Sequence, residues 1–240
     1  MSNGPDERTG RRWTIVGLAV SVSSALALTL LVVSDAAVLA WLDDPLTDFT
    51  RNWADSWEWP VTLAHEISNK TGVIWSSFVA GLFALFLFAR RRWGAGGFLM
   101  LSALLGGLIG LFMKDFVSRE RPPAAERFES DLTDSFPSGH TMVGIYLYLA
   151  TGLVLLRIGQ ANGRRWMTWL GWALIAFGPF LGLTRIVVGA HWPTDVLGGW
   201  AFGSAVVCLC ALLFWSPLNR QWLTWRSRAS SAATQQAAPS

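Results

Sequence analysis

Charged residues are scarce in this sequence. Asp, Glu, Lys and Arg make up 15% of its 240 residues, whereas about a quarter is usual in soluble proteins. Hydrophobic residues make up 52%, and the mean hydropathy is +0.38. So little charge argues against an ordinary soluble domain and favours a chain that lies mostly in a lipid bilayer.

Cysteine and histidine are also rare. Cys208 and Cys210 are two positions apart in an apolar segment, so on a helix they point in different directions and are expected to form neither a disulfide nor a metal site. The sequence has only three histidines and no carboxylate cluster suited to Mg²⁺. We therefore expect no metal and no other cofactor.

Long apolar segments predict membrane spans, each of which needs about 20 apolar residues. Six segments meet or nearly meet this length: 13–34, 72–89, 93–113, 137–156, 166–184 and 196–218. The first is too long for the apolar region of a signal peptide, about 7–15 residues. We predict an all-α polytopic membrane protein with six transmembrane helices, one domain over 13–221, and polar, disordered tails at 1–12 and 222–240.

Arginines gather in alternate loops. They precede the first segment, separate the second from the third and the fourth from the fifth, and follow the sixth: Arg8, Arg11, Arg12, Arg90, Arg91, Arg92, Arg157, Arg164, Arg165, Arg220, Arg226 and Arg228. The positive-inside rule then predicts cytoplasmic termini in an inner (plasma) membrane, with loops 43–71, 114–136 and 185–195 outside. The net charge of +3 is explained by these topology signals. It does not indicate a nucleic-acid partner, because no basic stripe alternates with aromatic residues.

The long outer loop 43–71 contains a helical pattern. Leu46, Phe49, Trp53 and Trp57 recur at helical spacing among charged residues. This pattern predicts an extracytoplasmic helix lying in the membrane interface. Such a helix could be an aromatic anchor at the level of the lipid headgroups, or a lid or lateral gate for a lipid substrate.

Three polar blocks stand at the outer ends of apolar segments, and they supply three cations, two imidazoles and one carboxylate. A charge near hydrocarbon costs on the order of 2–4 kcal/mol unless it faces water or a partner. Stability alone does not account for such a set, so we expect it to hold and cleave a phosphate. The blocks are 114–122, 137–140 and 184–195.

The first block contains Lys114 and Arg121. Seven residues are close to two helical turns, so a continuous helix would place both cations on one face about 10 Å apart. Pro122 would then end the helix, and Arg119 and Glu120 would point elsewhere. Cations are the unexpected sign at an outer membrane edge, which favours phosphate binding over a simple basic stop.

The second block is Pro137-Ser138-Gly139-His140, directly before the fourth apolar segment. Ser138 is well placed as a helix N-cap, and Gly139 would let a ligand approach the backbone. The free N–H groups of a helix N-terminus form an anion site. His140 would stand in the first turn, beside the bound anion.

The third block contains Arg185, His191 and Asp195. Pro193 is tolerated in the first turn of a helix, and the spacing from i to i+4 lets the carboxylate reach one imidazole nitrogen. This contact would fix the tautomer and leave the other nitrogen unprotonated, as a nucleophile requires. Arg185 can offer a planar fork of donors to phosphate oxygens.

Combined, the three blocks resemble the type 2 phosphatidic acid phosphatase (PAP2) superfamily of integral membrane lipid phosphatases. The matching signatures are Lys114-x6-Arg121-Pro122, Pro137-Ser138-Gly139-His140 and Arg185-x5-His191-x3-Asp195, in the order of the family. The resemblance covers roughly 110–200. Thr184 departs from it, because the family usually has Ser before the arginine.

The resemblance implies a metal-independent reaction. His191, oriented by Asp195, would attack phosphorus and form a phosphohistidine, and His140 would protonate the leaving oxygen. Lys114, Arg121, Arg185, Ser138 and Gly139 would bind the phosphate.

The resemblance leaves the substrate open. The expected partner is a lipid phosphate or diphosphate, with undecaprenyl diphosphate, the cell-wall carrier lipid, favoured over phosphatidylglycerophosphate and phosphatidate. A lipid phosphotransferase and a non-enzymatic lipid-phosphate transporter remain alternatives. Binding alone would not need a second histidine in addition to a His–Asp pair.

Overall fold

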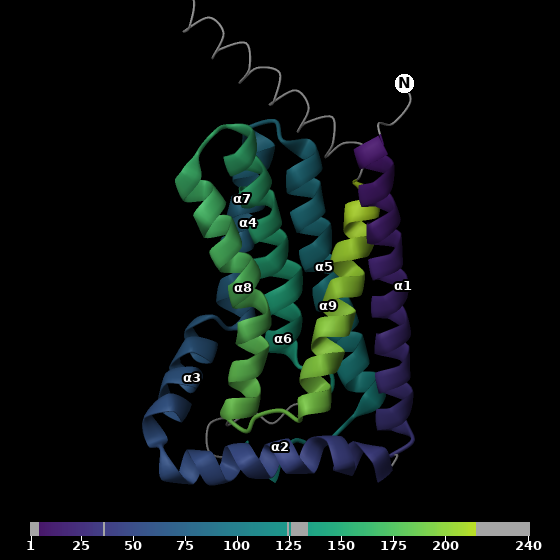
Figure 1. The fold of residues 1–240 in the computed structure, drawn as a ribbon, viewed down its shortest axis with the longest axis vertical. Coiled ribbons are helices and arrows are strands. Elements are labelled where there is room, and N and C mark those ends of the chain that lie inside the picture. The colour runs from purple at the N-terminus through teal and green to yellow at the C-terminus, as the bar shows by residue number, and fades with distance from the viewer. Residues whose placement is uncertain (1–4, 36, 124, 126–133, 215–240) are drawn as a thin grey trace, which may run out of the picture.

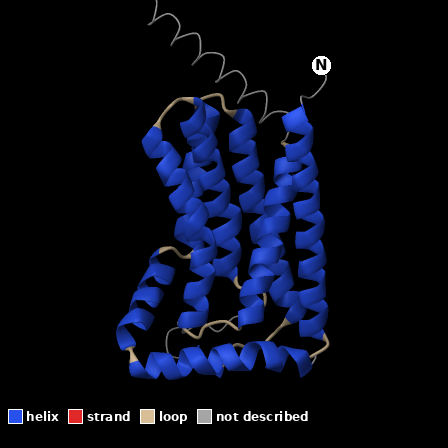
Figure 2. Cartoon of the chain, viewed as in Figure 1, coloured by secondary structure: helices blue, strands red, loops and turns tan. Residues whose placement is uncertain are grey.

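The described chain is helical apart from its connecting loops (Figure 2), and the all-α prediction is confirmed for it. The computed structural model describes residues 5–35, 37–123, 125 and 134–214. The predicted tail 222–240 lies outside these residues. The elements in chain order are α1 (Pro5–Val33), α2 (Ala37–Ser56), α3 (Glu58–Lys70), α4 (Val73–Ala89), α5 (Trp93–Val117), α6 (Gly139–Val143), the π-helical segment η2 (Gly144–Leu149), α7 (Ala150–Ala161), α8 (Arg165–Val187) and α9 (Pro193–Leu213).

Five helical segments in the described chain are long and apolar enough to cross a membrane: 8–33 in α1, α5, the continuous run from α6 to α7, α8 and α9. The remaining predicted span, 72–89, corresponds to α4, which qualifies only together with α3, across a bend of 46°. The predicted polytopic membrane fold is therefore confirmed, with five single spans and a sixth that is bent or short. α1 also begins earlier than predicted, because residues 5–12, expected in a tail, form its first two turns.

The spanning helices stand side by side, and α2 lies across their ends (Figure 1). The first residues of α1 lie at the opposite end of the bundle. The main core is formed by α4, α5, the α6–α7 run and α9, around Phe98, Leu99, Tyr146, Leu147 and Val206. The α6–α7 run is the most buried of the spans, so the second polar block begins the central helix.

α2 turns an unusual face towards the protein. Its buried side chains recur every three or four residues and are mostly polar: Leu39, Asp43, Thr47 and Thr50. The aromatic stripe of the sequence, including Phe49 and Trp53, is exposed. This is the orientation of a helix whose apolar face meets lipid and whose polar face meets the end of the bundle.

The central run and α8 touch backbone to backbone. A Cβ atom added to Gly144 would collide with the carbonyl oxygen of Gly178, and one added to Gly178 would collide with the carbonyl oxygen of Gly144. Small residues at a crossing let two membrane helices approach this closely. The contact sets the spacing between the helices that carry His140 and Arg185.

We predict that Gly144→Ala destabilises the fold by about 1–3 kcal/mol, the usual cost of overpacking. The matched control is Gly81→Ala in α4, where an added Cβ meets nothing within 4 Å and where alanine is expected to stabilise the helix by roughly 0.5–1 kcal/mol. Thermal unfolding in detergent measures both. Equal melting temperatures for the two variants would contradict this packing.

Candidate active site

The three polar blocks meet at the end of the bundle that α2 crosses (Figure 1). Lys114 lies in the last turn of α5 and Arg185 in the last turn of α8. Gly139 and His140 begin α6, and Asp195 lies in the first turn of α9. Two helix C-termini and two helix N-termini thus bring residues that are distant in the sequence to one place.

His191 and Asp195 form the predicted pair. Nδ1 of His191 lies 3.4 Å from Oδ2 of Asp195, and both side chains are almost completely buried. Asp195 also accepts a hydrogen bond at 2.9 Å from the backbone N–H of Trp192, which caps α9. The carboxylate of Asp195 therefore both caps the N-terminus of α9 and faces the imidazole of His191.

The surroundings of His191 define its tautomer. Its Nε2 faces Nη1 of Arg121 at 3.4 Å, and a guanidinium has donors only, so Nε2 must be the acceptor. The carboxylate at the other nitrogen accepts only, so Nδ1 carries the proton. Burial lowers the pKa of His191 to about 3, which keeps the imidazole neutral at physiological pH. A neutral imidazole with an unprotonated Nε2 beside a cation is suited to attack a bound phosphate.

Arg121 reaches the site from a loop, not from a helix, and here the prediction was wrong. α5 ends at Val117, and Ser118 adopts the left-handed conformation with φ of 46°. Residues 119–122 have no helical structure. Pro122 disfavours a helical conformation at the residue before it, and the loop lets Arg121 donate to the carbonyl of Ala190 at 3.0 Å. Arg121 is thus beside His191 because of this extended loop.

Lys114 and the second block lie close together. Nζ of Lys114 donates to the carbonyl of Asp134, and a methyl group placed on Gly139 would lie 3.9 Å from Cε of Lys114. Ser138 occupies the N-cap position as predicted, but its hydroxyl accepts a hydrogen bond from Thr141 instead of capping the helix. Its backbone N–H donates to the carbonyl of Asp195 at 3.1 Å. This bond joins the second block to the third.

His140 faces the break between α3 and α4. A methyl group on Gly72 would lie 3.9 Å from Nε2 of His140. Arg185 is 2% exposed, and its carbonyl accepts the N–H of Ala190. The structure thus places every predicted site residue at the same end of the bundle.

Sequence reasoning missed one cation. Arg119, expected to point elsewhere, donates from Nη1 to Oδ1 of Asp195 at 2.6 Å and from Nη2 to Oδ2 of Asp43 at 2.7 Å. Ser135 also donates to Asp195. Of these residues, only Arg119 could have been noticed in the sequence, because it is a cation two positions before Arg121. The assumption of a continuous helix placed its side chain on the wrong face.

Comparison with known proteins agrees with this geometry. The profile described as the PAP2 superfamily matches residues 95–218, which is more than half of the chain. The chain belongs to the PAP2 superfamily.

Several curated PAP2 relatives carry different names. Lipid A 1-phosphatase of Rhizobium johnstonii is 32% identical over 129 residues, covering 50% of this chain and 48% of that protein. Phosphatidylglycerophosphatase B of Bacillus subtilis is 29% identical and covers 71% and 76%. Undecaprenyl-diphosphatase of Sulfolobus acidocaldarius is 32% identical and covers 50% and 56%. The chain thus aligns with about half the length of the first and third of these.

A solved structure shares the fold. The crystal structure of a transmembrane PAP2-type phosphatidylglycerolphosphate phosphatase from Bacillus subtilis matches with a TM-score of 0.59 at 20% identity. The match covers 79% of this chain and 93% of that one. The Thr184 departure from the usual PAP2 serine keeps a hydroxyl, which lies 2.8 Å from the hydroxyl of Ser68 and so links α8 to α3.

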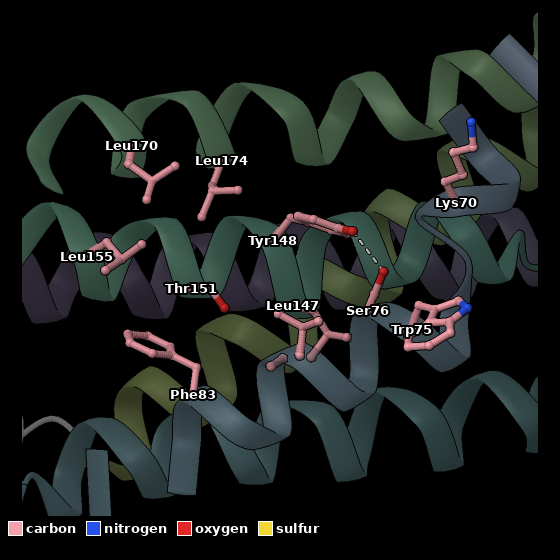
Figure 3. A pocket seen from close by; sticks show the side chains of 12 residues that line it. Lys70, Trp75, Ser76, Phe83, Leu147, Tyr148, Thr151, Leu155, Leu170 and Leu174 are labelled. Atoms are coloured by element: carbon pink, nitrogen blue, oxygen red, sulfur yellow. Dashed lines mark hydrogen bonds between the residues drawn. The ribbon is translucent and has the colours of Figure 1, made fainter. Parts of the chain in front are cut away.

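An apolar cavity of about 400 Å³ lies between α4, the η2–α7 run and α8 of this PAP2 chain (Figure 3). Lys70 and Trp75 lie at one end of it, Leu155 and Leu170 lie at the other, and Tyr148 is hydrogen-bonded to Ser76 at 2.8 Å beside it. The Lys70 end adjoins the α3–α4 break, where Gly72 approaches His140. One end of this apolar cavity thus lies near the candidate site.

Proposed function

We propose that this chain is a metal-independent lipid phosphatase that works through a phosphohistidine intermediate. The observation that carries the proposal is the neutral, buried His191, held between Asp195 and Arg121. A phosphate bound by Arg121 would lie next to Nε2 of His191. Lys114, Arg185 and the backbone of 138–140 would bind the other oxygens, as suits a group with nearly two negative charges.

The reaction has two steps. Nε2 of His191 forms a bond to phosphorus while the bond from phosphorus to the leaving oxygen breaks, and His140 in its protonated form donates a proton to that oxygen. Neutral His140 then accepts a proton from water, whose oxygen forms a bond to phosphorus while the bond from phosphorus to Nε2 breaks, so that inorganic phosphate leaves and neutral His191 is restored. Asp195 stabilises the positive charge that develops on His191 during the first step.

We expect His191→Ala to abolish turnover, whereas Asp195→Asn and His140→Ala should each lower it by at least about 10²-fold. Rapid acid-free quenching with a radiolabelled phospholipid should trap phosphohistidine in the wild type at pH 5 as well as at pH 7, because His191 stays neutral at both. Activity should persist in excess EDTA, and orthovanadate should inhibit it.

Two results would overturn the phosphohistidine proposal. One is hydrolysis by His191→Ala at a rate near that of the wild type. The other is loss of activity in EDTA that Mg²⁺ restores. Lipid binding without any phosphate release by the wild type would instead support a transporter, and transfer to a lipid acceptor would support a phosphotransferase.

The substrate we favour is undecaprenyl diphosphate. An outward-facing active site suits this long-chain lipid, because its dephosphorylation recycles the cell-wall carrier. The alternative substrates are lipid A and phosphatidylglycerophosphate, for which relatives are named, and phosphatidate. All of them place a phosphate at the membrane surface above hydrocarbon chains. The apolar cavity beside the site suits such a chain, since its lining is almost entirely hydrocarbon.

Filling this cavity should weaken the binding of long lipids. Ala80 lines the cavity from α4, and Ala80→Phe should raise KM for a long-chain lipid phosphate by about tenfold, equivalent to about two methylene groups lost from burial. Turnover of a short-chain, water-soluble phosphate should stay unchanged. Leu82→Phe, at an exposed position of the same helix, is the control. Equal losses with both substrates would argue against a chain in the cavity.

We also propose that the site is extracytoplasmic, because the loop arginines predict cytoplasmic termini. In a background with Cys208→Ala and Cys210→Ala, a cysteine at Thr62 in α3 should react with an impermeant maleimide on intact cells. A cysteine at Asn162, after α7, should react only after permeabilisation. The reverse labelling would invert the topology.

A further inference from the structure

The polar face of α2 is not explained by membrane anchoring. An anchor needs the exposed aromatic face, but it does not need an aspartate on the opposite side. Asp43 is 1% exposed, and a carboxylate buried without partners would be strongly destabilising. Its contacts therefore indicate what the buried face of α2 does.

Asp43 is fully engaged at the start of α9. Its Oδ1 accepts the backbone N–H of Thr194 at 2.9 Å, and its Oδ2 accepts the Thr194 hydroxyl at 2.7 Å. The same Oδ2 forms the ion pair with Nη2 of Arg119 at 2.7 Å. Asp43 thus joins α2 to the helix that carries Asp195, over about 150 residues of sequence.

Arg119 connects the two carboxylates. Nη1 contacts Asp195 at 2.6 Å and donates to the Thr194 hydroxyl at 2.8 Å, and Nη2 contacts Asp43. Cζ of Arg119 lies 5.4 Å from the centre of the Trp192 ring. A planar guanidinium has a fixed fork geometry, so holding one arm orients the other. Asp43, directly and through the Thr194 hydroxyl, therefore orients Arg119 towards Oδ1 of Asp195.

The charges explain why a second carboxylate is required. Arg119 alone would neutralise Asp195 and weaken its attraction for the positive charge that develops on His191. With Asp43 present, the two carboxylates and one guanidinium carry a net charge of −1, which remains available to the imidazole. The position of Asp195 is fixed without loss of its electrostatic effect.

We propose that Asp43 is a positioning residue for the reaction: by holding Arg119 it fixes Asp195, and through Asp195 the nucleophile His191. The outer-loop helix α2 is then part of the catalytic apparatus as well as an interfacial helix. This inference rests on the proposed phosphohistidine reaction.

The test is single-turnover kinetics of phosphohistidine formation with the full-length protein in detergent micelles and undecaprenyl diphosphate as the substrate. The amplitude counts folded, competent sites, and the rate constant measures chemistry. Asp43→Asn should lower the rate constant by at least about tenfold, which is less than the roughly 10²-fold minimum for losing a group that assists proton transfer directly, because Asp43 acts through Asp195. In separate steady-state assays KM should change little, because Asp43 lies behind Asp195 and is not expected to reach the phosphate.

A double-mutant cycle identifies the route. Arg119→Gln should also slow phosphohistidine formation, and Asp43→Asn combined with Arg119→Gln should be no slower than the slower single variant, because both changes break one connection. Asp44→Asn is the matched control. It makes the same chemical change at the next residue of α2, whose side chain is exposed, and it should behave as wild type.

Three outcomes would overturn the inference. A wild-type rate constant in Asp43→Asn is one, and a lower amplitude with an unchanged rate constant, the mark of a merely structural role, is another. The third is a double variant whose rate constant falls by the product of the two single-variant factors. If Asp43→Asn does not fold, Asp43→Glu retains the charge at a different distance, and a wild-type rate constant in that variant would equally count against precise positioning.

Failure of this inference can be told from failure of the proposed function. If His191→Ala still turns over, the phosphohistidine reaction itself is wrong. If His191→Ala is inactive and the wild type forms phosphohistidine, but Asp43→Asn reacts at the wild-type rate, only the role of Asp43 is wrong.

Discussion

The buried carboxylate of Asp195 is the group on which the rest of the site depends. An ionised carboxylate away from water needs several donors to offset its lost hydration, and Asp195 obtains them from Arg119, Ser135 and the backbone of Trp192. Each donor comes from a different part of the chain. Satisfying this one charge therefore draws the 119–122 loop, the segment before α6 and the start of α9 together, and Arg121 reaches His191 as a result.

The membrane helices could be predicted from the sequence because a span is a local property. Length and apolar composition alone identify it, and the observed helices match the predicted ones to within a few residues at most ends. The exceptions were local as well. Residues 5–12 are polar yet helical, and α4 is short enough that its identity as a span depends on α3.

The site was only partly predictable, because its decisive contacts are long-range. The His191–Asp195 pair follows from a spacing of four residues across the start of α9, and the structure has the pair, with His191 just before the helix and Asp195 in its first turn. The spacing of Lys114 and Arg121 suggested a continuous helix, yet α5 ends at Val117, since Arg119 lies between two carboxylates that no local pattern reveals. Asp43 is 76 residues from Arg119, and in the sequence it resembles any other acidic residue of a surface helix.

The location of α2 across the end of the bundle has a practical consequence for protein engineering. Long loops of membrane proteins are the usual places to insert epitope tags or fluorescent domains, because their backbone contributes little to the core. In this chain the region between α1 and α3 carries Asp43, and its register along α2 decides whether that carboxylate meets Arg119. Even one added residue before Asp43 would rotate it about a quarter turn away, so fusion points are better chosen in the short loops at the opposite end.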